Sequence, residues 1–227
     1  MDRDVLQNLM KRFPMKVLPN GNIRTCPVRL SFTYLAEARE PENPKQKPKY
    51  SALLLFPKGA DISLLVNACK TSATEEHGAD ALKLVETGKI KWPLKDQGKM
   101  TRDDGEMWDG CEAGAKAVEA KTERRPGTVD ASASPCDPAK LYSGCWALVT
   151  VHTFAGSHEK GGKYVSVGLN NLQFLADDER FGGGAQITDP ADEFSAIDGT
   201  TDSGALFNGS GAAGEPAAKD AGSFDFG

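Results

Sequence analysis

The sequence contains no long hydrophobic run. None of its apolar stretches approaches the roughly 20 residues needed to cross a bilayer. The start of the chain, Met1-Asp2-Arg3-Asp4, is not followed by the apolar region of a signal peptide. These absences predict a cytoplasmic protein with no membrane partner.

Motifs for catalysis and for metal or cofactor binding are also missing. Of the three histidines, His77, His152 and His158, none lies in a recognisable catalytic motif, and no phosphate-binding glycine loop joins a strand to a helix. The five cysteines are an odd number without a CxxC pair, which argues against both a disulfide framework and structural zinc. The sequence therefore predicts a protein that is not an enzyme and needs no cofactor or metal.

One acidic cluster keeps a catalytic alternative open. Asp103, Asp104 and Glu106 lie within four residues of one another and could hold a metal ion for nuclease or resolvase chemistry. The cluster lacks the spacing of a calcium loop, and Asp-Asp-Gly is a common turn sequence. A third interpretation is a virion structural protein with a solubilising tail.

Charge is divided unequally along the chain. Residues 176–227 contain eleven acidic residues against two basic ones, a net charge of −9, whereas residues 1–175 carry a net charge of +4. The acidic segment is rich in glycine and alanine and has no periodic apolar pattern, so it is predicted to be a disordered tail. Its last residues include Phe224, Asp225 and Phe226, an aromatic tip predicted to contact a protein partner.

The first 175 residues are predicted to form one mainly β domain. Helical spacing of apolar residues marks three candidate segments for short helices, over 4–13, from Asp61 to near Gly78, and over 80–87. Strands are predicted over 26–34, 50–56, 113–122, 127–130, 141–154 and 163–175. The last two should pair through a turn over 155–162. This pattern favours an OB-fold-like five-stranded barrel, or a slightly elaborated one, with one or two short helices.

Basic residues alternate with aromatic ones in the second half of this domain. A positive groove can follow the phosphates of single-stranded nucleic acid while aromatic rings stack on its bases. Tyr142 and Trp146 either stack in this way or belong to the core of their strand. The predicted DNA-binding residues are Lys89, Lys91, Trp92, Lys95, Lys99, Arg102, Trp108, Lys116, Lys121, Arg124, Arg125, Tyr142, Trp146 and Tyr164.

Four short runs carry a resemblance to a known family. They are Leu141-Tyr-Ser-Gly-Cys-Trp146, Gly168-Leu-Asn-Asn-Leu-Gln173, Trp92-Pro-Leu-Lys-Asp96 and Met107-Trp-Asp-Gly110. Over roughly Thr25 to Gly184 the chain resembles the single-stranded DNA-binding proteins of tailed bacteriophages, a group distantly akin to the T7-type protein.

The resemblance implies an OB barrel that coats single-stranded DNA during phage replication or recombination in the host cytoplasm, without catalytic activity. It also implies an acidic tail that recruits replication proteins and competes with DNA for the basic groove. Binding of duplex DNA or RNA and formation of a homodimer are left open by the sequence.

A truncation would test competition by the tail. Removing the chain after Leu175 is expected to raise the affinity for single-stranded DNA, because a segment of charge −9 is lost. A gel-shift comparison at low salt would measure the change, and equal affinities would contradict competition.

Overall fold

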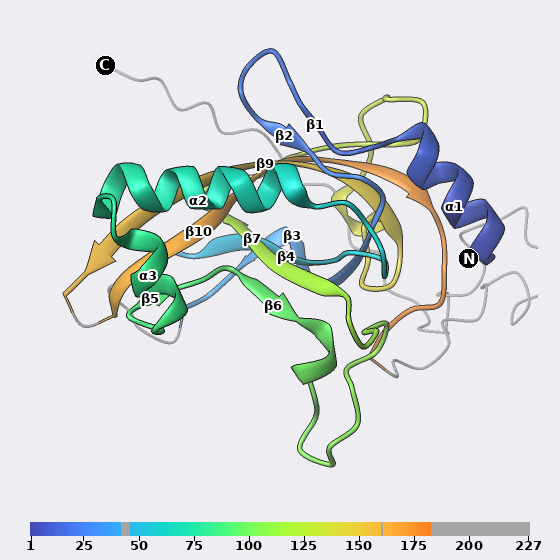
Figure 1. The fold of residues 1–227 in the computed structure, drawn as a ribbon. Coiled ribbons are helices and arrows are strands. Elements are labelled where there is room, and N and C mark those ends of the chain that lie inside the picture. The colour runs from blue at the N-terminus through green and yellow to red at the C-terminus, as the bar shows by residue number, and fades with distance from the viewer. Residues whose placement is uncertain (42–45, 160, 183–227) are drawn as a thin grey trace, which may run out of the picture. The chain divides into compact units, whose positions relative to one another are not determined.

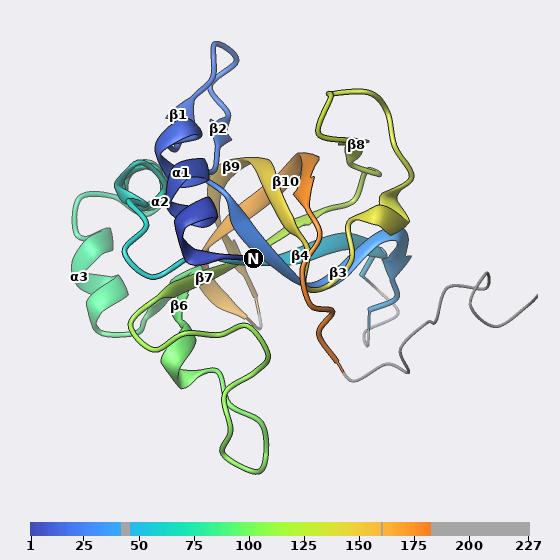
Figure 2. The same cartoon turned by 90° about the vertical axis from the view of Figure 1, so that its right-hand side faces the viewer.

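Five strands pair edge to edge and close into a barrel in this computed structural model (Figures 1 and 2). The pairing runs β3–β4–β7–β10–β9 and returns from β9 to β3, and only β7 and β10 are parallel within this circuit. The strands are β3 (Val28–Arg39), β4 (Lys49–Leu55), β7 (Lys116–Thr122), β9 (Trp146–His158) and β10 (Gly162–Ala176). This is the predicted five-stranded barrel of the OB-fold type.

The structure describes residues 1–41, 46–159 and 161–182, all within one unit, Met1–Ala185. The predicted tail from residue 183 onward, including Phe224, Asp225 and Phe226, lies outside these residues. None of the helices described in these ranges is long and apolar enough to cross a membrane.

Helices and short strands surround the barrel in the described chain. Helix α2 packs against β9 and turns Leu65, Cys69 and Ala73 into the core, while Ser72 Oγ lies 2.8 Å from Thr153 Oγ1. The additional elements are α1 (Arg3–Arg12), β1 (Lys16–Val17), β2 (Ile23–Arg24), α2 (Ser63–His77), α3 (Ala81–Glu86), β5 (Ile90–Lys91), β6 (Leu94–Asp96), β8 (Gly127–Val129) and the 3₁₀ helices η1 (Gln97–Lys99) and η2 (Pro138–Lys140).

Every second side chain along the strands points inward, and these side chains fill the barrel. The inward residues are small or branched, so they fit a narrow interior without voids. They include Val28, Leu30, Leu35, Ala52, Leu54, Val118, Ala120, Val149, Val151, Val165, Val167 and Leu169, all at most 4% exposed. The intervening residues point outward, and they determine what the barrel presents to a ligand.

In the β9–β10 hairpin, β9 begins and ends later in the chain than the sequence predicts. Residues 141–145 were expected in a strand but form a turn, because Gly144 has a φ of 116° and its position approaches the Glu179 carbonyl too closely for any side chain. Residues 155–158, expected in the turn, continue β9, and the chain reverses between His158 and Gly162. The residues of β9 therefore lie nearer the tip of the hairpin than predicted.

Phe32 breaks the predicted alternation of β3. The pattern of alternate apolar residues places Phe32 inside the barrel together with Leu30, but the side chain is 50% exposed. The register against β4 gains one residue between Ser31 and Tyr34, and Phe32 has a φ of 45°. This β-bulge re-aims the ring toward solvent, because an extra residue reverses the side-chain direction.

A second apolar cluster lies outside the barrel. Leu53, Leu55 and Ala117 point outward and are buried beneath Met100, with Trp108 and Phe181 packed against them. The covering loop is fixed by Gln97, which is 1% exposed. Gln97 Nε2 donates to the carbonyls of Phe56 (2.9 Å) and Lys116 (2.6 Å), and Gln97 Oε1 accepts from the Glu112 amide (2.9 Å).

Residues 177–182, which follow β10, form a strap across one end of the domain. Asp178 Oδ2 lies 2.6 Å from the Met1 ammonium and 3.7 Å from Arg29 Nη2, and it accepts a 2.7 Å hydrogen bond from Trp146 Nε1. The Phe181 amide donates to the Ser143 carbonyl (3.0 Å). The contacts of the described domain thus continue past residue 175, through the end of β10 and the strap.

The strap aspartate is held in its charged form. Burial alone raises the pKa of Asp178, but hydrogen bonds from the Met1 ammonium, the Trp146 indole and the Glu179 amide, together with Arg29, lower the pKa from 3.8 to about 2. Because the folded-state pKa is depressed, this stabilisation is present above about pH 4 and is lost as the pH falls toward 2.

Replacing this carboxylate should loosen the strap. Asp178→Asn is expected to lower the free energy of unfolding by about 1–3 kcal/mol, because the buried donors around it lose a charged acceptor. Asp177→Asn is the matched control, since Asp177 is exposed and its carboxylate accepts a hydrogen bond from the Tyr142 hydroxyl. Urea unfolding at pH 7 measures both variants, and equal midpoints would show that the Asp178 contacts contribute nothing.

Candidate nucleic-acid interface

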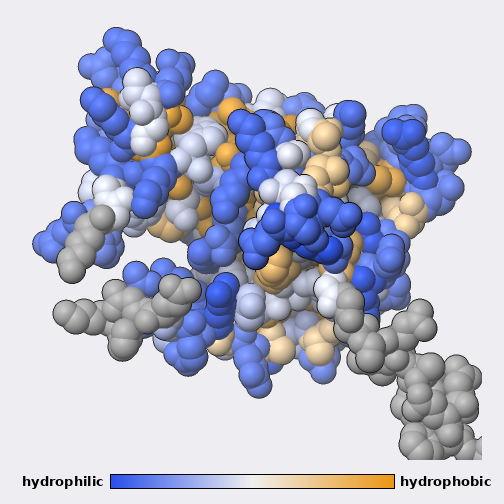
Figure 3. All heavy atoms as spheres, turned by 90° about the horizontal axis from the view of Figure 1, so that it is seen from below, coloured by the Kyte–Doolittle hydropathy of each residue, from blue (hydrophilic) through white to orange (hydrophobic). Residues whose placement is uncertain are grey.

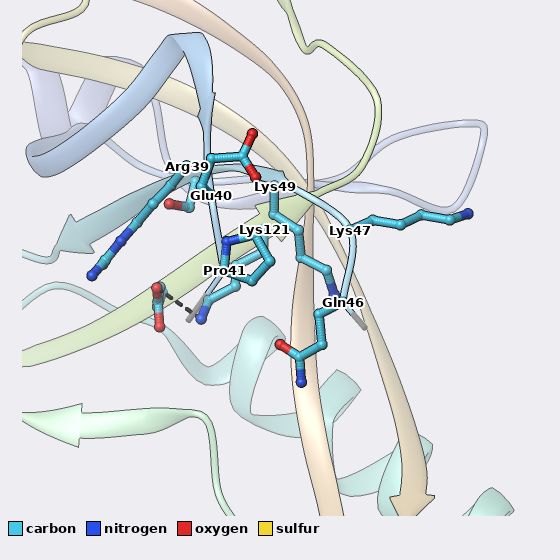
Figure 4. A pocket seen from close by; sticks show the side chains of 9 residues that line it. Arg39, Glu40, Pro41, Gln46, Lys47, Lys49 and Lys121 are labelled. Atoms are coloured by element: carbon cyan, nitrogen blue, oxygen red, sulfur yellow. Dashed lines mark ion pairs between the residues drawn. The ribbon is translucent and has the colours of Figure 1, made fainter. Parts of the chain in front are cut away.

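A basic groove opens on the outer face of β4 and β7, beside the described residues 39–41 and 46–47 (Figure 4). Its volume is about 460 Å³. Four cationic side chains face two carboxylates around it. The lining residues are Arg39, Glu40, Pro41, Gln46, Lys47, Lys49, Ser51, Glu119 and Lys121.

Strand register brings these cations together from distant parts of the sequence. Arg39 is opposite Lys49 across β3 and β4, and Ser51 is opposite Lys121 across β4 and β7. Ala52 and Ala120, one residue further along, are fully buried. Since neighbours on a strand alternate in direction, Ser51 and Lys121 must face outward into the groove.

The groove lysines have exposed acidic neighbours. Lys121 Nζ lies 2.9 Å from Glu119 (dashed in Figure 4), and Glu123 lies 3.4 Å from Lys47 and 4.0 Å from Lys49. Exposed ion pairs of this kind contribute at most about 1 kcal/mol, so a phosphate group can replace the carboxylate at little cost. The Arg39 guanidinium stands 5.3 Å from the centre of the Tyr34 ring.

Aromatic side chains lie on the outer face of the β9–β10 hairpin. Phe154 is 42% exposed and meets Tyr164 edge to face, with 6.4 Å between the ring centres. His152 packs against Gly168, where any side chain would overlap the imidazole ring. Gly168 is also the neighbour of Lys121 on β7. The aromatic face and the basic groove therefore adjoin.

The outer surface offers both kinds of contact that a nucleic acid needs. Seen from below, most surface side chains are hydrophilic, with separate hydrophobic residues between them (Figure 3). Phe32 and Phe154 are the aromatic members of the exposed large hydrophobic residues in the described ranges. Cations can hold phosphates and exposed rings can stack on bases, so this surface is suited to a single strand.

The structure brings some of the predicted DNA-binding residues to this surface and not others. Lys121 lines the groove, and Tyr164 pairs in register with Lys91 beside the aromatic face. Trp108 packs against Phe32, and neither of the two lines the groove. Lys116 pairs with Asp96, Arg102 pairs with Asp109, and Trp92 packs against the core. The remaining basic residues are exposed outside the groove lining: Lys89, Lys95, Lys99, Arg124 and Arg125.

Tyr142 and Trp146 are engaged by the strap. Trp146 is 6% exposed and donates to Asp178, and the Tyr142 hydroxyl donates to Asp177 (2.9 Å) beneath the Arg180 guanidinium (3.8 Å from the ring centre). Of the two sequence interpretations, the structure places Trp146 in the core.

Several residues of this surface were missed by the sequence analysis. Arg39, Lys47 and Lys49 flank or occupy the Pro/Lys-rich segment 40–49, whose composition was a usable signal for a basic loop. His152 and Phe154 were assigned only to a strand. Phe32 had no sequence signal, because the alternating pattern assigns it to the core.

The acidic cluster has the geometry of a turn. The Gly105 amide donates to the Arg102 carbonyl (3.0 Å), and Asp104 Oδ1 accepts from the Glu106 amide (2.9 Å). Asp103, Asp104 and Glu106 are all exposed, and the described chain contains no group of three acidic, histidine or cysteine side chains placed to hold a metal ion. Burial raises the pKa of Cys26, Cys69 and Cys145 to about 12, so these thiols stay protonated.

Comparison with known proteins agrees with this fold. The family described as the single-stranded DNA-binding protein of Enterobacter phage Enc34 matches residues 21–204. The solved structure of the bacteriophage Enc34 single-stranded DNA-binding protein in complex with ssDNA has a TM-score of 0.61 at 23% identity, covering 74% of this chain and 93% of that one.

A more distant solved structure shares the fold. Gp2.5, a single-stranded DNA-binding protein encoded by bacteriophage T7, has a TM-score of 0.52 at 14% identity, covering 83% of this chain and all of that one. No curated protein sequence matches. Because the family match spans most of the chain, this protein belongs to the Enc34-type family of phage single-stranded DNA-binding proteins.

Proposed function

We propose that this protein binds single-stranded DNA along the outer face of its barrel and coats it during phage DNA replication or recombination in the host cytoplasm. The observation that carries the proposal is the groove of Arg39, Lys47, Lys49 and Lys121 on β4 and β7. In OB-folds, this face and its adjoining loops bind oligonucleotides. Family membership supports the same assignment.

The chemistry of the surface favours binding without sequence preference and without catalysis. Lysine and arginine side chains contact phosphates, which are the same at every nucleotide, and aromatic rings stack on any base. The acidic tail is proposed to compete with DNA for this groove and to recruit replication proteins through Phe224, Asp225 and Phe226.

Removing two groove cations should weaken binding and its salt dependence. Lys49→Ala/Lys121→Ala is expected to make the slope of log affinity against log salt less steep by about 1.4, because each lost phosphate contact on a single strand contributes about 0.7. The slope can be measured by fluorescence anisotropy with a labelled oligothymidylate.

The matched control is Lys11→Ala/Lys70→Ala, which removes two exposed lysines from α1 and α2. It should keep the wild-type slope. If both double variants change the slope equally, the groove is not the path of the DNA.

Because the strap contacts the domain, a truncation that tests the tail alone should end after Gly182 and not after Leu175. Ending the chain after Gly182 removes eight acidic residues and one lysine but keeps Asp178 and Phe181. This form is expected to bind DNA more tightly at low salt and to melt like the full chain. Ending it after Leu175 also removes the strap, and a loss of about 1–3 kcal/mol lowers Tm by several degrees in a domain of this size.

A full-length variant with those eight acidic residues changed to Asn or Gln separates charge from length. It should bind like the chain that ends at Gly182, and the differences should shrink as salt rises. If this variant bound DNA with the same affinity as the unmodified full-length chain, the tail would act through something other than its charge.

A further inference from the structure

A pocket between Phe32 and Trp108 lies outside the basic groove. Its volume is about 350 Å³. The two rings meet edge to face, with 5.0 Å between their centres and 64° between their planes. The lining residues are Ser31, Phe32, Arg102, Trp108, Asp109, Ser143, Phe181 and Gly182.

Both the backbone conformation and the solvent exposure of Phe32 are unfavourable. A positive φ is rare for a residue other than glycine, and a large apolar ring gains from being buried. Phe32 has a φ of 45° and remains 50% exposed, even though alternation on β3 would place it inside. Strained backbone and bulges of this kind concentrate at binding sites, where they aim a side chain at a ligand.

Trp108 is held firmly from behind. Its amide donates to the Met100 carbonyl (2.9 Å), and Thr101 pairs with Met107 to close a short hairpin beside it. The indole packs on the cluster of Leu53, Leu55 and Ala117. A preorganised ring loses little entropy when a ligand stacks on it.

The remaining walls combine ring faces with polar groups. Phe181 is held under the Arg29 guanidinium, 4.3 Å from its ring centre, and the Gly182 amide donates to Asp109 Oδ2 (3.0 Å). Arg102 pairs with the same aspartate. An occupant with flat apolar faces, a polar edge and a neighbouring negative charge fits such walls, and a nucleotide of single-stranded DNA has all three.

The pocket and the groove lie close to each other across the strands. Ser31, which lines the pocket, pairs with Leu53, and Leu53 pairs with Glu119, which lines the groove. Two interstrand steps correspond to about 10 Å. A DNA strand held by Lys49 and Lys121 therefore needs only a few nucleotides to reach Phe32.

We propose that the Phe32–Trp108 pocket takes one base of the DNA strand that occupies the basic groove, with Arg102 facing the adjoining phosphate. The proposal rests on the proposed function and adds a stacking site to it. The site fixes where a base leaves the groove, and the base identity is not read because stacking accepts any base.

Two variants test the pocket through oligothymidylate binding. Phe32→Ala is expected to weaken binding by about 5- to 150-fold, the range for loss of one base–aromatic stack, and Leu82→Ala on α3 should leave it unchanged. Trp108→Phe keeps an aromatic ring and should retain binding within a few-fold. It should nevertheless lose most of the DNA-induced tryptophan quenching, because Trp146 is buried and Trp92 packs against the core.

A further test measures which base enters the pocket. A single abasic site is placed at each position in turn of the shortest oligonucleotide that binds, and the affinity is measured each time. One position should weaken wild-type binding as much as Phe32→Ala does, and the penalty at that position should vanish in Phe32→Ala. Penalties that are equal in both proteins at every position would overturn the pocket.

The outcomes separate the pocket from the proposed function. The pocket would be overturned if Phe32→Ala bound DNA with wild-type affinity and Trp108→Phe kept the wild-type quenching. Weaker DNA binding by Lys49→Ala/Lys121→Ala in the same experiment would leave the groove supported. Absence of any binding by the wild-type protein and by the chain ending at Gly182 would overturn the proposed function itself. Circular dichroism melting verifies that each variant is folded.

Discussion

Closure of the sheet between β3 and β9 is the constraint on which the other features depend. Val28 and Arg29 pair with Ala147 and Trp146, and these pairs join the first barrel strand to the fourth. Once the circuit is closed, each strand has one set of side chains that must fill the interior and one set that faces outward. The groove, the aromatic face and the second apolar cluster are all made from the outward set.

The same junction connects the barrel to the strap. Arg29 Nε donates to the Gly144 carbonyl (3.0 Å) and Arg29 Nη2 to the Glu179 carbonyl (3.0 Å), while its guanidinium covers Phe181. One side chain thus contacts the barrel closure, the turn before β9 and the strap, which is the first part of the acidic segment. The strap also supplies a wall of the Phe32–Trp108 pocket.

Much of the fold was predictable because strand alternation is a local property. The strands near 50–56 and 163–175, the helices near 4–13 and 61–78, and the five-stranded barrel agree with the pattern of apolar residues. The site was predictable only in part. Composition identified a basic, aromatic protein, but the cations of the groove lie at residues 39, 47, 49 and 121, and strand register alone brings them together.

The sequence by itself determined the barrel class, the unequal division of charge and the kind of ligand that these side chains suit, because each follows from composition or short-range periodicity. Tertiary structure alone decided that Phe32 faces outward and that Trp146 is covered by Asp178. A bulge depends on the register of the neighbouring strand, and burial of Trp146 depends on a residue 32 positions away. Contacts between residues so far apart in the sequence do not alter the local pattern of apolar residues, so that pattern cannot reveal them.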